Sequence, residues 1–337
     1  MNESDRPAHA NSRPKEHWAL TPFEPSRAVR LAQAAELPLA VAELLVARGI
    51  ESAEEAVEFL HPNLSQLHSP FKMLGMEAAV ERVEAAIAQG ETILLYGDYD
   101  VDGTTAVVLL KTAIEMLGGT VRFHVPHRLL EGYGLQTAVL EEAYAEGVRL
   151  VITVDTGMRA FEEAKAAARM GLDLIVTDHH LADAKAELPV ALAILNPNQP
   201  GCSYPSKDLC GAGIAMKLAL ALLERKNGER TWTKTLPSFL KLLAIATVAD
   251  AVPLKGENRA IVALGLKELS QPVGLGLCAL MQVAQIDFAK HKLTAFDLGF
   301  RLGPRINAAG RMDVASEVVE LFTTRDAGRA RELAAQL

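Results

Sequence analysis

Between residues 92 and 195, short runs rich in Val, Ile and Leu alternate with longer segments of helical periodicity. Short apolar runs bounded by turn residues are typical of buried strands, and consecutive parallel strands need a crossover that is usually a helix. The alternation predicts an α/β fold, a parallel sheet with helices on both faces. The predicted strands are Thr92–Tyr96, Val121–Val125, Arg149–Val154, Asp173–Thr177 and Leu192–Leu195, and the helices between them are Thr104–Leu117, Gln136–Ala145 and Ala160–Met170.

Helical regions flank this α/β pattern on both sides. Residues 1–24 are polar and predict a flexible arm, and residues 25–90 predict a helical preamble. We expect the α/β domain over 91–255 and a helical extension over 256–337. Outside the sheet, helices are predicted over Met76–Gln89, Ile214–Lys226, Leu236–Ala249, Arg259–Leu269, Gly274–Val283 and Asp326–Leu337.

The composition is that of a globular protein without a membrane segment. Of the 337 residues, 50% are hydrophobic and 23% are charged, and no apolar run approaches the roughly 18 residues of a membrane span. The three cysteines form no CxxC pair and the N-terminus lacks the apolar core of a signal peptide, so we expect a cytoplasmic protein. A net charge of −8 argues weakly against nonspecific coating of nucleic acid, although a local basic groove could still bind it.

An acidic loop follows the first predicted strand. Its sequence, Gly-Asp-Tyr-Asp-Val-Asp-Gly over residues 97–103, brings three carboxylates to the carboxyl end of that strand. Ligands of open α/β sheets bind at this edge, and crowded carboxylates repel one another unless a cation neutralises them. The alternative is an acidic turn whose side chains only cap a helix.

Three further segments carry polar side chains at comparable positions. Val-Asp-Thr-Gly (154–157) and Thr-Asp-His-His (177–180) follow two later strands, and Val-Ala-Asp-Ala-Val-Pro-Leu (248–254) ends a helix. Capping explains one such Asp, but four sites at corresponding ends are hard to explain in that way. Asp and His together bind Mn²⁺ or Mg²⁺, and about five ligands exceed the needs of one ion, so two ions that share a carboxylate fit better.

These four segments, in this order, resemble motifs I to IV of the DHH phosphoesterase superfamily. Other segments are similar to those of its RecJ family of single-strand-specific 5′→3′ exonucleases. They are Pro-His-Arg (126–128) with Glu-Gly-Tyr-Gly (131–134), Cys-Gly-Ala-Gly (210–213), and Gly-Pro-Arg-Ile-Asn-Ala-Ala-Gly-Arg (303–311). The chain ends before the Gly-Gly-His motif and OB-fold of such proteins, so the resemblance implies an N-terminal portion.

The resemblance also implies roles for individual residues. Asp155 would bridge two divalent cations, Mn²⁺ or Mg²⁺, and His180 would contact the scissile phosphate. Asp98 would support the ligands without binding an ion itself, although the sequence does not rank the three acids of motif I. Some relatives carry His where this chain has Tyr96, so water is expected at one coordination position. The implied metal ligands are Asp100, Asp102, Asp155, His179 and Asp250.

Other residues of the matching segments are typical of phosphate contacts. Arg128 follows the second strand, where a guanidinium can clamp a phosphate and assist catalysis. Gly211 and Gly213 open a helix and let backbone N–H groups approach a phosphate, although close helix packing explains them almost as well. Most Phe residues are interpreted as packing residues and not as base-stacking platforms. The segment 303–311 is expected to be a Gly/Ala-rich turn that contacts the DNA backbone through Arg305, Asn307 and Arg311.

The function implied by the resemblance is metal-dependent hydrolysis of single-stranded DNA from its 5′ end to mononucleotides, in DNA repair and recombination. The implied partners are single-stranded DNA, a single-strand-binding protein and a helicase. One alternative is a phosphodiesterase for short oligonucleotides or cyclic dinucleotides, but such relatives lack a segment like 303–311. Another is a DNA-binding relative without catalysis, which should have lost ligands that this chain keeps.

Overall fold

The computed structural model describes residues 21–127, 131–182, 187–228, 235–270, 274–287, 292–311 and 315–337. The chain divides into two compact units, Met1–His61 and Pro62–Leu337. The predicted arm lies outside the described residues apart from 21–24. No described helix is long and apolar enough to cross a membrane.

The smaller unit is built from three short helices. Its core is made of small and aliphatic side chains, among them Ala28, Leu31 and Leu45. Ser52 caps the third helix: its side chain accepts a hydrogen bond from the Glu55 backbone while the Glu55 side chain caps in return. The helices are α1 (Pro25–Ala34), α2 (Leu39–Ala47) and α3 (Ala53–Leu60).

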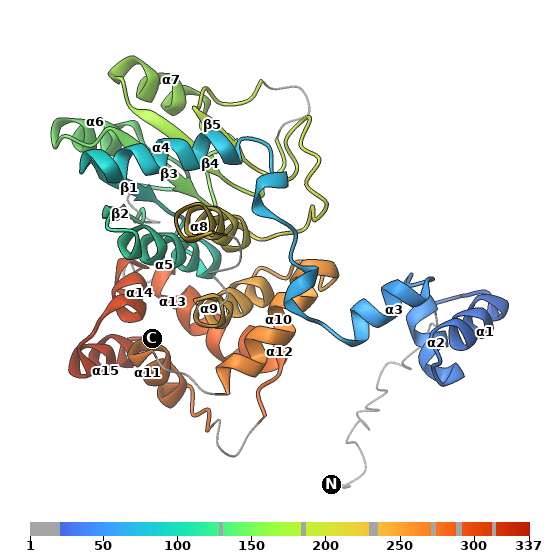
Figure 1. Ribbon diagram of the computed structural model, residues 1–337. Helices are drawn as coiled ribbons and strands as arrows, with labels where there is room; N and C mark the ends of the chain where they lie inside the picture. The colour runs from blue at the N-terminus through green and yellow to red at the C-terminus, as the bar shows by residue number, and fades with distance from the viewer. Residues whose placement is uncertain are drawn as a thin grey trace, which may run out of the picture. The chain divides into compact units, whose positions relative to one another are not determined.

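The larger unit contains the predicted parallel sheet (Figure 1). Its five strands follow the order β2-β1-β3-β4-β5, and every neighbouring pair is parallel. The α/β prediction is therefore confirmed, and the strand boundaries differ from those predicted by at most a residue at either end. The strands are β1 (Thr92–Tyr96), β2 (Thr120–His124), β3 (Leu150–Val154), β4 (Asp173–Thr177) and β5 (Ala193–Leu195).

Helices cover both faces of the sheet because alternate strand side chains enter different cores. Ile93 and Leu95 join the core beneath α4, α5 and α8, whereas Leu94 and Tyr96 join the core beneath α6 and α7. Figure 1 shows the sheet between these two helix layers. Their bounds are α4 (Met76–Gln89), α5 (Val101–Met116), α6 (Thr137–Ala145), α7 (Phe161–Met170) and α8 (Gly211–Asn227).

Helix α4 differs from the expected domain division. We predicted that it belongs to the preamble over 25–90, but it packs against α8 and β5 in the larger unit. Its buried stripe, which includes Met76, Val80 and Val83, is covered by the sheet core. Two short turns precede it, η1 (Leu64–Gln66) and η2 (Pro70–Lys72).

The C-terminal part is helical, as predicted, and packs mainly through α9 and α14 on α5. One expectation was wrong: the segment 303–311 is not a Gly/Ala-rich turn but helix α13, because its buried Ile306 and Ala309 lie one turn apart. The elements are α9 (Leu236–Ala249), α10 (Gly256–Leu269), α11 (Leu275–Val283), α12 (Ala295–Asp297), the π-helical turn η4 (Leu298–Leu302), α13 (Gly303–Arg311), α14 (Ala315–Thr323) and α15 (Ala327–Ala335).

Candidate metal centre

The candidate site lies at the carboxyl ends of β1, β3 and β4. In the strand order β2-β1-β3-β4, the chain leaves β1 toward β2 on one side and leaves β3 toward β4 on the other side. The crevice between two such strands is where α/β proteins bind ligands. The loop with Asp98 and Asp100 follows β1, and Asp155 follows β3. The topology thus assembles carboxylates that are more than fifty residues apart in the sequence.

The motif I loop holds its three carboxylates in different ways. Asp100 caps α5 and accepts a hydrogen bond from the Gly103 backbone (2.9 Å). Asp98 is buried and accepts one from the Tyr99 backbone (2.7 Å). Asp102, also buried, points toward α8 and accepts two hydrogen bonds from that helix. Each carboxylate is therefore fixed by backbone N–H groups and not by a cationic side chain.

Asp155 stands at the centre of the site in an unusual backbone conformation. Its φ of +60° is uncommon for a residue with a side chain, although Asp and Asn tolerate it better than most. Its backbone N–H continues the sheet by donating to the Thr177 carbonyl (2.9 Å). The conformation turns the chain sharply out of β3 and leaves the side chain buried against the ends of the strands.

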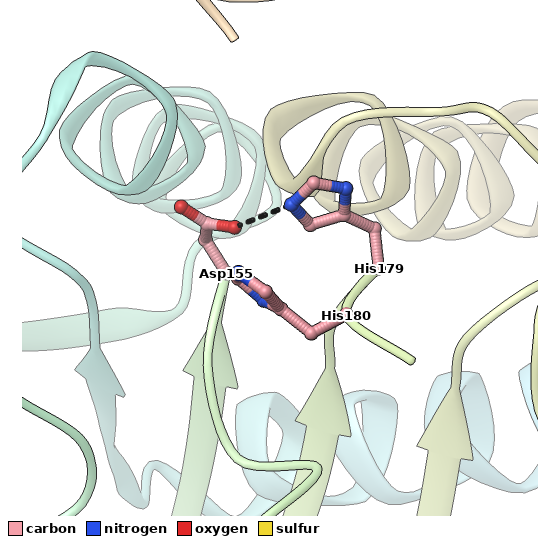
Figure 2. A group of neighbouring side chains, drawn as sticks. All are labelled: Asp155, His179 and His180. Carbon is pink, nitrogen blue, oxygen red and sulfur yellow. Dashed lines mark ion pairs between the residues drawn. The ribbon is translucent and has the colours of Figure 1, made fainter. Parts of the chain in front are cut away.

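His179 faces three carboxylates from the end of β4. Its Nε2 atom lies 3.3 Å from Asp155 Oδ1 and 3.9 Å from Asp102 Oδ2, and its Nδ1 atom lies 3.8 Å from Asp250 Oδ2. Figure 2 shows His179 directed at Asp155, with His180 from the same loop beside them. Asp250 arrives from a different direction, since it directly follows the C-terminus of α9.

Three sets of side chains have ligand atoms within 4.8 Å of one another. Asp155 and His179 each belong to two of the sets, so the sets merge into one cluster. All five residues predicted as metal ligands are in this cluster, together with Asp98 and His180. The sets are Asp155, His179 and His180; Asp102, His179 and Asp250; and Asp98, Asp100 and Asp155.

The cluster fits a divalent cation. Asp155 Oδ1 and Asp250 Oδ2 are buried carboxylate oxygens that accept no hydrogen bond in the described structure. Buried polar atoms without a partner are rare and costly, and a bound ion would satisfy both. A Cβ atom on Gly211 would lie 2.5 Å from Asp155 Oδ1, so only glycine leaves room for this carboxylate. Asp and His oxygen and nitrogen donors suit Mn²⁺ or Mg²⁺.

Electrostatics point the same way. Burial and the charge of Asp100 raise the pKa of Asp98 to about 7, and burial and the charge of Asp102 raise the pKa of Asp250 to about 7. Burial, followed by the charge of Asp102, also raises the pKa of Asp155 well above its usual value. Burial lowers the pKa of His179, which favours the neutral imidazole that a metal requires.

His180 has a partner of its own that the sequence did not single out. Its Nδ1 atom lies 2.7 Å from Asp178 Oδ1, and Asp178 is further fixed by the Met158 backbone N–H. This hydrogen bond raises the pKa of His180 and fixes the orientation of its ring through Nδ1. The only signal in the sequence was the acidic residue directly before the His-His pair.

Two asparagines hold the backbone of the His-His loop. The Asn196 side chain donates to the His180 carbonyl (2.9 Å), and the Asn198 side chain donates to the His179 carbonyl (3.3 Å). The Asn196 side chain also accepts a hydrogen bond from the Asn198 backbone, which forms a turn over Asn-Pro-Asn (196–198). Both residues therefore position the histidines and do not join the cluster themselves.

The predicted phosphate contacts of α8 have other roles in the structure. The backbone N–H of Gly211 donates to Asp102 Oδ2 (2.5 Å) and that of Ala212 donates to Asp102 Oδ1 (2.9 Å), so the helix terminus is already occupied by a carboxylate. Gly213 packs against Leu209, the alternative considered from the sequence. The N-terminus of α8 thus binds the Asp102 carboxylate of motif I, at the place where we expected a phosphate.

The predicted DNA contacts of α13 are divided. Asn307 Oδ1 accepts a hydrogen bond from the Val101 backbone (2.9 Å), so this side chain holds the motif I loop. A Cβ atom on Gly310 would lie 2.4 Å from the Tyr99 carbonyl oxygen, which shows how closely α13 approaches that loop. Arg305 donates to the Arg301 carbonyl. Arg128 and the side chain of Arg311 lie outside the described structure.

Tyr96 takes no part in the cluster. It is fully buried at the end of β1, in the core beneath α6 and α7, and its hydroxyl donates to the Gly134 carbonyl (2.8 Å). Burial raises the pKa of its hydroxyl, which keeps the side chain neutral. Its hydroxyl ties β1 to the Glu-Gly-Tyr-Gly segment.

The N-terminal domain of the DHH family matches residues 92–247, which begin at β1 and end within α9. Residues 92–247 are a DHH-family domain. Three of the four acidic segments lie inside the matched region, whereas the motif IV segment (248–254) begins directly after it, with Asp250 three residues beyond its end. The DHH domain therefore includes the whole sheet and most of the metal cluster.

The chain is also similar to particular exonucleases. It is 41% identical over 323 residues to the single-stranded-DNA-specific exonuclease RecJ of Bacillus subtilis, covering 96% of this chain and 39% of that protein. It is 40% identical over 312 residues to RecJ of Escherichia coli, covering 90% and 52%. The crystal structure of Thermus thermophilus RecJ in complex with Mn²⁺ matches with a TM-score of 0.77 at 29% identity, covering 94% and 44%. The chain thus spans about half or less of the length of these relatives.

Proposed function

We propose that this chain is the catalytic part of a metal-dependent exonuclease that hydrolyses single-stranded DNA from its 5′ end to mononucleotides. The observation that carries the proposal is the buried Asp155 carboxylate, which has an oxygen without a hydrogen-bond partner in a cluster of seven Asp and His side chains. The similarity to the single-stranded-DNA-specific exonuclease RecJ supports the substrate. The direction of hydrolysis follows from the motif resemblance alone.

Two divalent cations, Mn²⁺ or Mg²⁺, are the proposed cofactors, and structures of a RecJ relative contain these ions. Asp155 would be shared between them because it belongs to two of the three ligand sets. When bound, such ions polarise phosphoryl oxygens and lower the pKa of water. The remaining proposed ligands are Asp100, Asp102, His179 and Asp250.

His180 is proposed to hold a phosphate oxygen. Asp178 fixes its ring through Nδ1 and favours the protonated imidazole, so Nε2–H is available to donate to an anion. His180 also belongs to one of the three ligand sets. The division of roles, with His179 as a metal ligand and His180 as a phosphate contact, is therefore a prediction to be tested. Arg128 is proposed as a second phosphate contact from the sequence resemblance, and Asp98 as a support for the ligands.

Partners beyond the substrate follow from the resemblance alone. A single-strand-binding protein and a helicase would present or generate the single strands on which the enzyme acts, and the cytoplasm is the expected compartment. A phosphodiesterase for short oligonucleotides or cyclic dinucleotides is the second candidate activity, and it uses the same metal cluster.

Digestion of 5′- and 3′-labelled single strands with Mn²⁺, Mg²⁺ or EDTA tests the proposal. We expect mononucleotides from the 5′ label first, and no product in EDTA. Asp155→Asn should be inactive, whereas Asp173→Asn, at the opposite end of the neighbouring strand β4, should keep its activity. Release from the 3′ end, or turnover in EDTA, would overturn the proposal, and a strong preference for dinucleotides would support the second candidate.

A further inference from the structure

Two phenylalanines stand exposed next to each other on the segment that precedes α13. Phe296 is 63% exposed and Phe300 is 71% exposed, and their rings are stacked with centroids 4.9 Å apart. Among the described residues beyond Val283, they are the only large hydrophobic side chains exposed to this degree. Their exposure sets this pair apart from the Phe residues that the sequence analysis interpreted as packing residues.

The turn that carries the rings is held by hydrogen bonds, an ion pair and buried side chains. Asp297 points inward, accepts hydrogen bonds from the Thr294 backbone and hydroxyl (2.9 Å each) and pairs with Arg301. Leu298 and Leu302 are buried on the inner side of the same turn. Fixing both ends of the turn in this way holds the rings outward at little further entropic cost, which favours their use as a binding surface.

This scaffold continues directly into the metal centre. The turn η4 runs into α13, where Asn307 binds the Val101 backbone and Gly310 touches the Tyr99 carbonyl. Phe300 precedes Asn307 by seven residues, which corresponds to about 10 Å along a helix. The segment that carries the stacked pair is therefore continuous with the helix that contacts the motif I loop.

The chemistry of this surface fits a base better than a protein. Two isolated rings are far smaller than the roughly 800 Å² that each partner contributes to a stable protein interface. Flat aromatic faces stack on nucleobases regardless of sequence. Arg305 follows Phe300 by five residues and forms no ion pair with a described carboxylate, so its charge is available to a phosphate of the same strand.

We propose that Phe296 and Phe300 form a stacking platform for the bases of a single strand whose backbone runs along α13 to the metal centre. The proposal rests on the proposed function, since it assigns a binding position for the same substrate. The two rings would orient the strand through its bases, while the metal cluster handles only phosphate. The platform would therefore discriminate strands with bases from strands without them.

Binding of a fluorescent oligothymidylate, measured in EDTA so that the strand stays intact, tests the platform. The double variant Phe296→Leu with Phe300→Leu should bind about tenfold more weakly, because stacking contributes roughly 1–3 kcal/mol per base and 1.4 kcal/mol is tenfold. The matched control, Phe296→Tyr with Phe300→Tyr, keeps both rings and should bind like the wild type. A strand of abasic residues should bind all three proteins equally weakly.

Each contrary result has a separate meaning. Equal binding of abasic and normal strands by the wild type would overturn the platform even if the Leu variant failed to fold. Unchanged affinity of a folded Leu variant would also overturn it, as would a change only in self-association measured by light scattering. Hydrolysis of bis(p-nitrophenyl) phosphate by the wild type in Mn²⁺ tests the proposed function independently, so its failure is distinguishable from that of the platform.

Discussion

Two buried charged clusters of the larger unit differ in whether their charges are paired. In the metal centre, Asp155 and Asp250 each keep a buried oxygen without a hydrogen-bond partner. In the second cluster, Lys217 of α8 lies 2.5 Å from Glu257 of α10, and both are fully buried. Glu257 also accepts hydrogen bonds from the Tyr204 hydroxyl (2.8 Å) and the His68 backbone N–H, so one cation and two neutral donors surround this anion.

The difference separates a site made for a ligand from a contact made for the fold. The Lys217–Glu257 cluster also binds the backbone of His68. The His68 backbone N–H donates to Glu257 (2.7 Å) and its carbonyl accepts from Lys217 (2.9 Å), so the segment before α4 is fixed to α8 and α10. A buried ion pair completed by hydrogen bonds requires nothing from solution. Crowded carboxylates with unused oxygens remain unfavourable until a cation binds.

The largest expected effect comes from Asp155→Asn. Asparagine tolerates the φ of +60° at this position better than alanine, so the change removes the charge with little added strain. Metal stabilisation of transition-state charge is worth several kcal/mol, and we expect turnover to fall at least about a thousandfold. Steady-state kinetics in saturating Mn²⁺ measure this, and near-normal turnover would contradict the metal assignment.

The metal-free variant should unfold at the same or higher urea concentration, because a repelling buried charge is gone.

The opposite pattern is expected for Lys217→Met. Removing one member of a buried ion pair leaves the charge of Glu257 uncompensated, which typically costs about 3–5 kcal/mol of the free energy of unfolding. Urea denaturation measures the loss, while turnover per folded molecule should stay near the wild-type value. The double variant Lys217→Met with Glu257→Leu is the control and should recover much of the stability. Lost turnover in the folded single variant would contradict a purely structural role.

Cation binding at the metal centre should raise the free energy of unfolding whether or not the Lys217–Glu257 pair is intact. Mn²⁺ at 100 times its dissociation constant should raise the free energy of unfolding by about 2.7 kcal/mol in the wild type. Lys217→Met should gain a similar amount because its metal centre is intact, and Asp155→Asn should gain much less. Thermal unfolding with and without Mn²⁺ makes the comparison, and equal gains in all three proteins would mean that the ion binds elsewhere.

The smallest effect is expected from Asn307→Ala. The loss of the hydrogen bond to the Val101 backbone loosens the loop that carries Asp100 and Asp102, and groups that orient ligands typically change metal affinity 10- to 100-fold. We expect about tenfold weaker Mn²⁺ binding by titration calorimetry. Asn63→Ala is the matched control, since Asn63 Oδ1 also accepts from a backbone N–H (Ser65, 2.9 Å) but lies next to the turn η1, outside the four motifs, and its loss should not change metal affinity.

Local patterns predicted most of the fold. Helix α4 and strands β1 and β4 begin and end where their periodicity and flanking turn residues indicated. Helix α5 starts three residues earlier than predicted, because Asp100 caps it and Gly103 is inside its first turn. The segment 303–311 was mistaken for a turn since Gly, Pro and Asn are frequent in loops, whereas burial of its apolar side makes it a helix.

The sequence by itself determined the α/β class and the identities of the candidate metal ligands, because strand periodicity is local and Asp and His are recognisable wherever they stand. Only the tertiary structure decided what surrounds them. The Gly211 backbone binds Asp102 and the Asn307 side chain binds the Val101 backbone, and both contacts form only when distant segments pack together. The contact of Asp178 with His180 is local in the sequence. A residue type states which bonds a side chain can form, and the packing of the chain decides which partner it meets.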